Sequence, residues 1–239
     1  MASISELTSS SGLIFSGTVM KIGESSVPEL PARRNLLVVR VDRGLRVDPA
    51  LGDLRGSMVT VETPSPEAFH LQQEAVFFTK SWIHGREIAV REVGHLEKNT
   101  EDPVAAEVQA LPDMHLKARL ASARLVVAAE VVEVRTIPGQ VPERRAPLWA
   151  VAVLRVEAAL KGYAEFADVY FPTSDSHRWI KSPRFHLHQR GVFVLTEHEP
   201  RAEKWLAAIG QPDGLTALEP ADFQPESKAG DIRSFLPAR

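Results

Sequence analysis

A short stretch in the second half of the chain gathers residue types that suit recognition of a partner. Residues 173–184 hold three cations around one aromatic residue, namely Arg178, Lys181 and Arg184 around Trp179, with Arg190 just beyond. Cations beside an aromatic ring suit a phosphate backbone with a stacked base, and they equally suit a protein interface. The remaining interpretation is a solvated loop with Trp179 folded back on its own domain.

Three histidines form a second candidate group. His186 and His188 are two residues apart, so on a strand they would face the same side and could reach one metal ion, with His177 as a third ligand. The alternative interpretation is ordinary hydrogen-bonded histidines, because this spacing alone is a weak signal and the chain has no cysteine. We therefore predict no metal and no cofactor, and keep these histidines as weak candidates.

The residue types of a catalytic triad occur once, within residues 174–177, but neighbours in sequence do not make a triad geometry. The sequence lacks a Gly-x-Ser-x-Gly motif, a P-loop, a dinucleotide fingerprint and a His-Glu-x-x-His motif. We predict no catalytic residue and no enzymatic activity. Arg144 and Arg145, which repeat Arg33 and Arg34 in a matching loop, join the candidates for partner binding.

Composition narrows the class of protein. The chain has 239 residues, 44% of them hydrophobic and 25% charged, with a net charge of -3. This composition is that of a globular protein, and the charge disfavours a protein that coats duplex DNA. The absence of cysteine excludes a disulfide scaffold. No apolar stretch has the length of a membrane span and no signal peptide is evident, so we expect a cytoplasmic protein without membrane partners.

Self-comparison of the sequence indicates two copies of one domain. Five segments of the first half recur in the same order in the second half, at offsets of 111 to 116 residues. The matching pairs are 13–22 with 125–134, 33–34 with 144–145, 40–46 with 155–161, 69–73 with 185–189 and 76–79 with 192–195. Val59 is matched with Val169, and the growth of the offset beyond this point measures an insertion at residues 173–184.

The apolar runs in each copy are short and rich in β-branched residues, which predicts strands. The expected strands are 13–22, 36–41, 58–61, 75–79 and 87–93 in the first copy, and 125–134, 149–156, 168–171, 192–196 and 205–209 in the second. Five strands per copy predict a mainly β protein of two tandem OB-like five-stranded Greek-key barrels with short linking helices.

The segment between the two predicted barrels is predicted to be helical, and the C-terminal tail is predicted to be irregular. Asp102 and Pro103 predict the start of a helix, and residues 114–123 favour a further turn or two. The predicted domains are a first barrel over 1–101, a helical linker over 102–122 and a second barrel over 123–239. From residue 211 the chain is rich in Pro, Asp, Glu and Gly, which predicts an irregular tail.

The order of these signals resembles the OB-like domain of tissue inhibitors of metalloproteinases and netrin modules. The resemblance rests on Gly17-Thr18-Val19, Val41 with Leu45-Arg46, Val59-Thr60-Val61 and Val76-Phe77-Phe78, and on Val131, Val156 with Leu160-Lys161-Gly162, Val169 and Val192-Phe193-Val194-Leu195. It implies the fold for both copies. Those inhibitors hold the protease metal through an N-terminal cysteine, and this chain has none, so the inhibitory mechanism does not carry over.

Two copies of one barrel without a catalytic motif predict a protein that acts by binding a partner through its surface. Our first hypothesis is a non-enzymatic binding or adaptor protein whose loops contact a protein partner, with Trp179 as the anchor. The second is single-strand nucleic-acid binding through the same loop together with Arg144, Arg145 and Arg190. The third is a metal-dependent hydrolase built on His177, His186 and His188.

Overall fold

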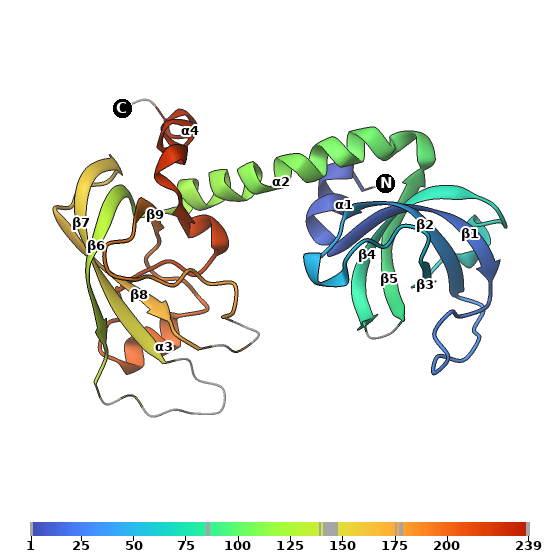
Figure 1. Cartoon of the computed structure of the whole chain (residues 1–239), viewed down its shortest axis with the longest axis horizontal. Helices are drawn as coiled ribbons and strands as arrows, with labels where there is room; N and C mark the ends of the chain where they lie inside the picture. The colour runs from blue at the N-terminus through green and yellow to red at the C-terminus, as the bar shows by residue number, and fades with distance from the viewer. Residues whose placement is uncertain are drawn as a thin grey trace. The chain divides into compact units, whose positions relative to one another are not determined.

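The structure is a computed structural model, and it describes residues 2–84, 87–138, 140, 148–174, 176 and 179–237. Its residues divide into two compact units, unit 1 (Met1–Leu111) and unit 2 (Pro112–Arg239) (Figure 1). The division falls inside one long helix, α2 (Glu101–Ser122).

Unit 1 is a closed five-stranded barrel. Its strands are β1 (Leu13–Ile22), β2 (Leu36–Arg46), β3 (Met58–Glu62), β4 (Glu74–His84) and β5 (Ile88–Glu97). They follow the order β1-β2-β3-β5-β4 around the barrel, and all pairings are antiparallel except that of β3 with β5. The barrel interior is packed with aliphatic and aromatic side chains, including Phe15 and Phe77, whose stacked rings lie 5.4 Å apart.

Unit 2 is a curled sheet of six strands. The strands are β6 (Leu125–Thr136), β7 (Trp149–Lys161), β8 (Phe166–Pro172), β9 (Arg190–Leu195), β10 (Leu215–Thr216) and β11 (Phe223–Gln224), in the order β10-β8-β7-β6-β9-β11. A bridge between Thr196 and Thr216 joins the end of β9 to β10. The prediction of two mainly β, barrel-like domains is therefore confirmed.

The strand pairings of the two units correspond, and β10 and β11 together occupy the position of β5. β10 runs parallel to β8, as β5 does to β3. Phe223 of β11 pairs with Phe193, as His95 of β5 pairs with Phe77. The residues between β10 and β11 include the 3-10 helix η4 (Pro220–Asp222). Unit 2 thus has the strand plan of unit 1 with its fifth strand interrupted.

Irregular features recur at equivalent positions as well. The pairing of β1 with β2 shifts register after Ile14, Ser16 and Val19, and that of β6 with β7 shifts after Val126, Ala128 and Val131. These three positions differ by 112 residues in every case. Bulges of this kind increase the local twist and coiling of a strand.

A tight turn precedes the fourth strand in both units. The backbone N–H of His70 donates to Gln73 Oε1 at 2.9 Å, and that of His186 donates to Gln189 Oε1 at 3.1 Å. The third residue of each turn, Gln72 or His188, has a φ of 64°, in the left-handed region that favours glycine. Two non-glycine residues therefore adopt the same unusual conformation at the same place.

The helices complete this correspondence. The short helix α1 (Ile4–Ser10) precedes β1, and the last part of α2 precedes β6 in the same way. After β5 come the 3-10 helix η3 (Lys98–Thr100) and the start of α2, and after β11 come η5 (Glu226–Lys228) and α4 (Ala229–Phe235). Val104 of α2 and Ile232 of α4 are both fully buried against their own sheets.

Three sequence predictions need correction, and one helix was not expected from the sequence. The strand expected over 205–209 is instead helix α3 (Glu203–Ala208), because the fifth-strand position is already filled by β10 and β11. The tail after residue 211 is not irregular throughout, since it forms those strands and α4. The helix α1 was not predicted. Strand pairing matches Val59 with Ala167 rather than Val169, because Val39 faces Val59 and the equivalent Leu154 faces Ala167.

Candidate functional site

The expected role of Trp179 as an exposed anchor is wrong. Its side chain is only 1% exposed and packs in a cluster with Trp149, Tyr170 and Leu206. The ring of Trp149 meets that of Trp179 edge-on, with their centroids 5.8 Å apart. The structure therefore agrees with the alternative in which this residue folds back on its own domain, and the exposed hydrophobic residue of the segment is its neighbour Ile180.

The cations predicted to accompany Trp179 are not gathered around an exposed ring. Lys181, Arg184 and Arg190 are exposed. Arg184 donates to the carbonyl oxygen of Ser174 at 3.1 Å, and Arg190 donates to both carboxylate oxygens of Glu157 at 2.7 Å. Arg144, Arg145 and Arg178 lie outside the described residues.

The histidine hypothesis rested on a strand that the structure does not contain. His186 and His188 lie in the tight turn before β9, which begins only at Arg190, so the same-face argument for a strand does not apply to them. His188 Nδ1 lies 3.0 Å from Glu130 Oε1, and this hydrogen bond is the main cause of the lowered pKa of Glu130. His177 lies outside the described residues, and within the described ranges no group of three His, Cys, Asp or Glu side chains could hold a metal ion.

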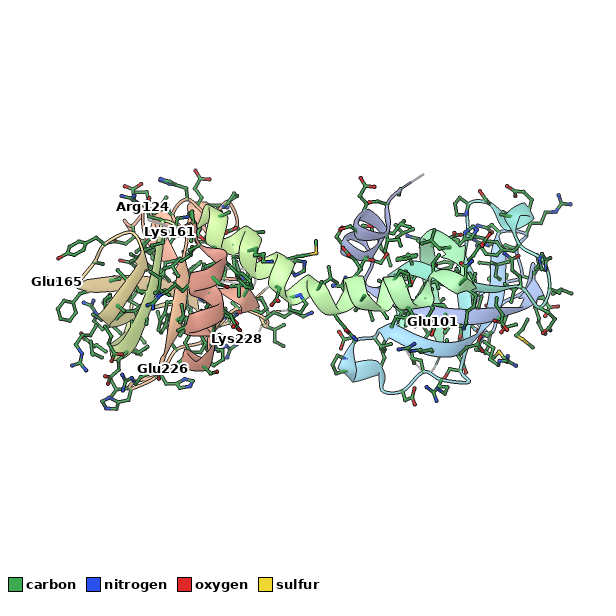
Figure 2. The ribbon with its side chains drawn as sticks, turned by 90° about the horizontal axis from the view of Figure 1, so that it is seen from above. Glu101, Arg124, Lys161, Glu165, Glu226 and Lys228 are labelled. Carbon is green, nitrogen blue, oxygen red and sulfur yellow. The ribbon has the colours of Figure 1, made fainter. Side chains whose placement is uncertain are left out.

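A pocket of about 470 Å³ lies at one end of the curled sheet of unit 2, and we call this region the open end. It is lined by the start of β6, the turn between β7 and β8, the start of β8, the residue Glu197 after β9, and Leu215 of β10. Tyr163 and Phe166 stand on its rim and are 82% and 60% exposed. Figure 2 labels Arg124, Lys161 and Glu165, which mark the chain around this end.

The same end of unit 1 is filled by its own chain. Eleven residues, 47–57, join β2 to β3, whereas only four residues, 162–165, join β7 to β8. Leu54 of the longer connection is 5% exposed and belongs to the core cluster of unit 1, and Leu51 packs against the same cluster. The turn of unit 2 is seven residues shorter, so it carries no counterpart of these two leucines.

A second difference enlarges the opening. Ile88 at the start of β5 packs against the core of unit 1. The pairing of Val90 with Val61 and of Leu215 with Val169 makes Asp213 the counterpart of Ile88. The carboxylate of Asp213 is 78% exposed, so this side chain does not pack against the core as Ile88 does. The open end therefore lacks apolar side chains on two sides where unit 1 has them.

The electrostatic character of the open end is mixed. Its described lining includes the carboxylates of Asp168 and Glu197 and the guanidinium of Arg124. Arg124 Nε lies 3.5 Å from Glu197 Oε1, and Asp168 accepts from Arg135 at 3.1 Å. Lys161, the last residue of β7, donates to the carbonyl oxygens of Leu120 and Ala121. The charges are thus engaged locally, and the apolar part of the described lining consists of Leu125, Ala164, Phe166, Ala167 and Leu215.

A larger hollow of about 640 Å³ lies on the face of unit 2 that carries Arg135, Val151, Asp168 and Tyr170. Burial, followed by the negative charge of Asp168, raises the pKa of the Tyr170 hydroxyl. The lining of this hollow reaches Pro138, which directly precedes residues outside the described ranges. The open end is therefore the better-defined of the two sites.

A buried ionic network holds the open end's supporting elements together. Arg119 of α2 donates to both carboxylate oxygens of Asp222, at 2.6 and 2.9 Å, to Glu199 at 3.1 Å and to Thr196 at 3.0 Å. Burial disfavours the charged form of Arg119, but the bonds to Asp222 and Glu199 outweigh it and raise its pKa. The network fixes η4, and with it the broken fifth strand, against α2.

No protein-family model matches the chain, and no curated protein matches it either. No helix in the described part of the chain is long and apolar enough to span a membrane.

The sequence did contain a signal for the open end. The offset between the two halves falls from 115 at Arg40 and Arg155 to 108 at Val59 and Ala167, which reveals the shortened connection. The prediction followed the insertion at residues 173–184 instead, because that segment contains a tryptophan and several cations. In the sequence, the shortened connection is marked by two aromatic residues, Tyr163 and Phe166, which the structure shows to be exposed.

Proposed function

We propose that this chain is a non-enzymatic protein-binding module and that the open end of unit 2 is its contact surface. One observation carries the proposal: unit 1 covers this end with Leu51 and Leu54, whereas unit 2 leaves a pocket that is partly apolar and is rimmed by the exposed rings of Tyr163 and Phe166. Aromatic side chains around an apolar depression are the usual anchors of protein interfaces.

Electrostatics favours a protein partner over a nucleic acid. A single strand binds through cations that are free to neutralise phosphates, together with stacking rings. The open end supplies the rings, but Arg124 is beside Glu197 and the lining contains two carboxylates. A phosphate backbone would meet those carboxylates, whereas a polypeptide segment with mixed charges would not be repelled.

The correspondence of the two units supports a further part of the proposal, an internal duplication of one OB-like domain. The shared strand order, the three bulges at a constant offset and the repeated turn with a positive φ are difficult to explain by independent origin. The resemblance to the OB-like domains of tissue inhibitors of metalloproteinases and netrin modules, and a cytoplasmic location, belong to this proposal too.

A capture experiment tests the function. The full chain, a Tyr163→Ala/Phe166→Ala double variant and a Leu187→Ala control are each immobilised and exposed to lysate of the source cells. Leu187 is a suitable control because it is 53% exposed in the same unit but lies in the turn before β9. We expect proteins that bind the wild type and the control but not the double variant.

Identical captured proteins on all three baits would refute the proposal. Circular dichroism of each variant shows that the loss of binding is not a loss of fold. A labelled single-stranded oligonucleotide, titrated at low and high salt, provides the comparison with the alternative. Saturable oligonucleotide binding that depends on Phe166 and weakens with salt would replace the protein-binding proposal by nucleic-acid binding.

A further inference from the structure

The connection between β2 and β3 shows which kind of segment closes this end of the barrel. We call residues 47–57 the leucine turn. It begins with Asp48, whose side chain accepts from the backbone N–H of Ala50 at 3.0 Å, and continues with Pro49 at the start of the 3-10 helix η1 (Pro49–Leu51). Leu51 and Leu54, three residues apart, then pack on the core.

The receiving surfaces in the two units are built from equivalent positions. Leu54 belongs to the same core cluster as Leu13, Val41 and Val59. The counterparts of these residues in unit 2 are Leu125, Val156 and Ala167, and both Leu125 and Ala167 line the open end. Leu125 and Ala167 are 5% and 7% exposed, and the smaller side chain of Ala167 in place of Val59 takes up less volume on this wall of the pocket.

We propose that the open end of unit 2 binds, in a partner protein, a short turn that presents two leucines three residues apart, the chemistry that the leucine turn supplies within unit 1. This inference rests on the proposed protein-binding function and names the class of partner segment. A second copy of this chain is not the source, because its own Leu54 is 5% exposed and would have to leave the core of unit 1.

The rim agrees with this occupant. Tyr163 in the turn between β7 and β8, and Phe166 at the start of β8, line the pocket together with Arg124 and Glu197. The leucine turn places Asp53 between its two leucines, with Oδ1 accepting from the backbone N–H of Arg55. Arg124, whose side chain is 70% exposed, suits an acidic residue in a partner segment, and the carboxylates of Glu197 and Asp168 suit a basic residue such as the arginine that follows Leu54 in the leucine turn.

A peptide that copies the leucine turn is the direct probe. The synthetic peptide Val-Asp-Pro-Ala-Leu-Gly-Asp-Leu-Arg-Gly-Ser, with blocked ends, is titrated into the full chain, and binding is followed by backbone NMR shifts. The matched control peptide carries alanine at both leucine positions. We expect shifts at residues 162–168, and at least a tenfold weaker affinity for the control peptide.

A filling variant tests the same pocket from the protein's side. Ala164 is partly buried and packs against the core of unit 2. Ala164→Leu would place an apolar side chain in the opening, and we expect it to weaken peptide binding at least tenfold while Leu187→Ala leaves binding unchanged. Urea midpoints of both variants establish that they remain folded.

The outcomes separate the two proposals. Equal affinity for both peptides, no shifts at millimolar peptide, or undiminished binding by Ala164→Leu would overturn the leucine-turn inference. If lysate capture still depends on Tyr163 and Phe166 in that case, the protein-binding function stands with another kind of segment. If neither the peptide nor the capture depends on the open end, both proposals fall.

Discussion

Replacement of Asp222 tests how the interrupted fifth strand of unit 2 is held in place. Asp222 is fully buried, and its carboxylate accepts from Arg119 Nε and Nη2 and from the backbone N–H groups of Leu218 and Glu219. In Asp222→Ala all four bonds are lost, and the guanidinium, which is 17% exposed, keeps only Glu199 and Thr196. Breaking one side of a buried ion pair costs about 3–5 kcal/mol.

We therefore expect Asp222→Ala to lower the free energy of unfolding of unit 2 by about 3–5 kcal/mol, which corresponds to a fall in Tm of roughly 10 °C or more. Urea unfolding followed by tryptophan fluorescence is a suitable assay, because Trp149, Trp179 and Trp205 all belong to unit 2. Asp222→Asn retains the shape and part of the hydrogen bonding, so its loss should be smaller.

The control is Asp231→Ala, which removes an exposed ion pair with Lys228 at 3.3 Å. Exposed pairs contribute about 0–1 kcal/mol, so this variant should unfold close to the wild type. A loss below about 1 kcal/mol in Asp222→Ala would refute the reasoning, because the network would then not be what fastens η4 and the strands around it.

Three further predictions concern single residues. Burial opposes ionisation of Glu101, but hydrogen bonds from Lys98, Ser16 and Arg43 outweigh it and lower its pKa from 4.5 to about 2. The stability that the Glu101 carboxylate contributes is therefore present above pH 4.5 and lost as the pH falls towards 2. NMR-detected urea midpoints of unit 1 should differ between wild type and Glu101→Gln at pH 6 and converge at pH 2, and a constant difference would contradict this. Gly191→Ala should destabilise unit 2 by about 1–3 kcal/mol and expose the amides of β11 to hydrogen exchange, because a Cβ there would lie 2.6 Å from the carbonyl oxygen of Gln224; unchanged exchange would show that β11 tolerates the methyl group. Gln72→Gly should stabilise unit 1 by about 1 kcal/mol in urea unfolding, because its φ of 64° is costly for a residue with a Cβ; a decrease would mean that the side chain contributes more than the backbone strain removes.

The sequence predicted the β architecture well because its signals are local. Short β-branched runs such as residues 125–134 and 192–196 specify strands directly, and the repeated order of these runs indicated matching units. The fifth strand of unit 2 could not be predicted in the same way. β10 and β11 have two residues each, too few for any periodicity, and they form because the neighbouring strands offer unpaired backbone groups.

The site was harder to predict for a related reason. Trp179 and its neighbouring cations look like an interface in one dimension, but the ring is buried by Trp149 and Leu206, which come from distant segments. The open end is defined by the absence of seven residues relative to unit 1. The sequence offsets indicate a shorter connection, but only strand pairing fixes which residues are equivalent and therefore which side chains are missing. The burial of a side chain, and the effect of a shorter connection on the core, depend on contacts between segments that are distant in sequence.

The helix α2 has a role on both sides of Pro112. Its first part buries Val104 against the sheet of unit 1, and its last part buries Leu116 and Leu120 in unit 2. Proline at this position cannot donate to the carbonyl oxygen of Val108, so the backbone hydrogen-bond ladder is already interrupted where the two units divide. Each half of α2 is therefore held by the core of its own unit, so disruption of one core leaves the buried contacts of the other half of the helix in place.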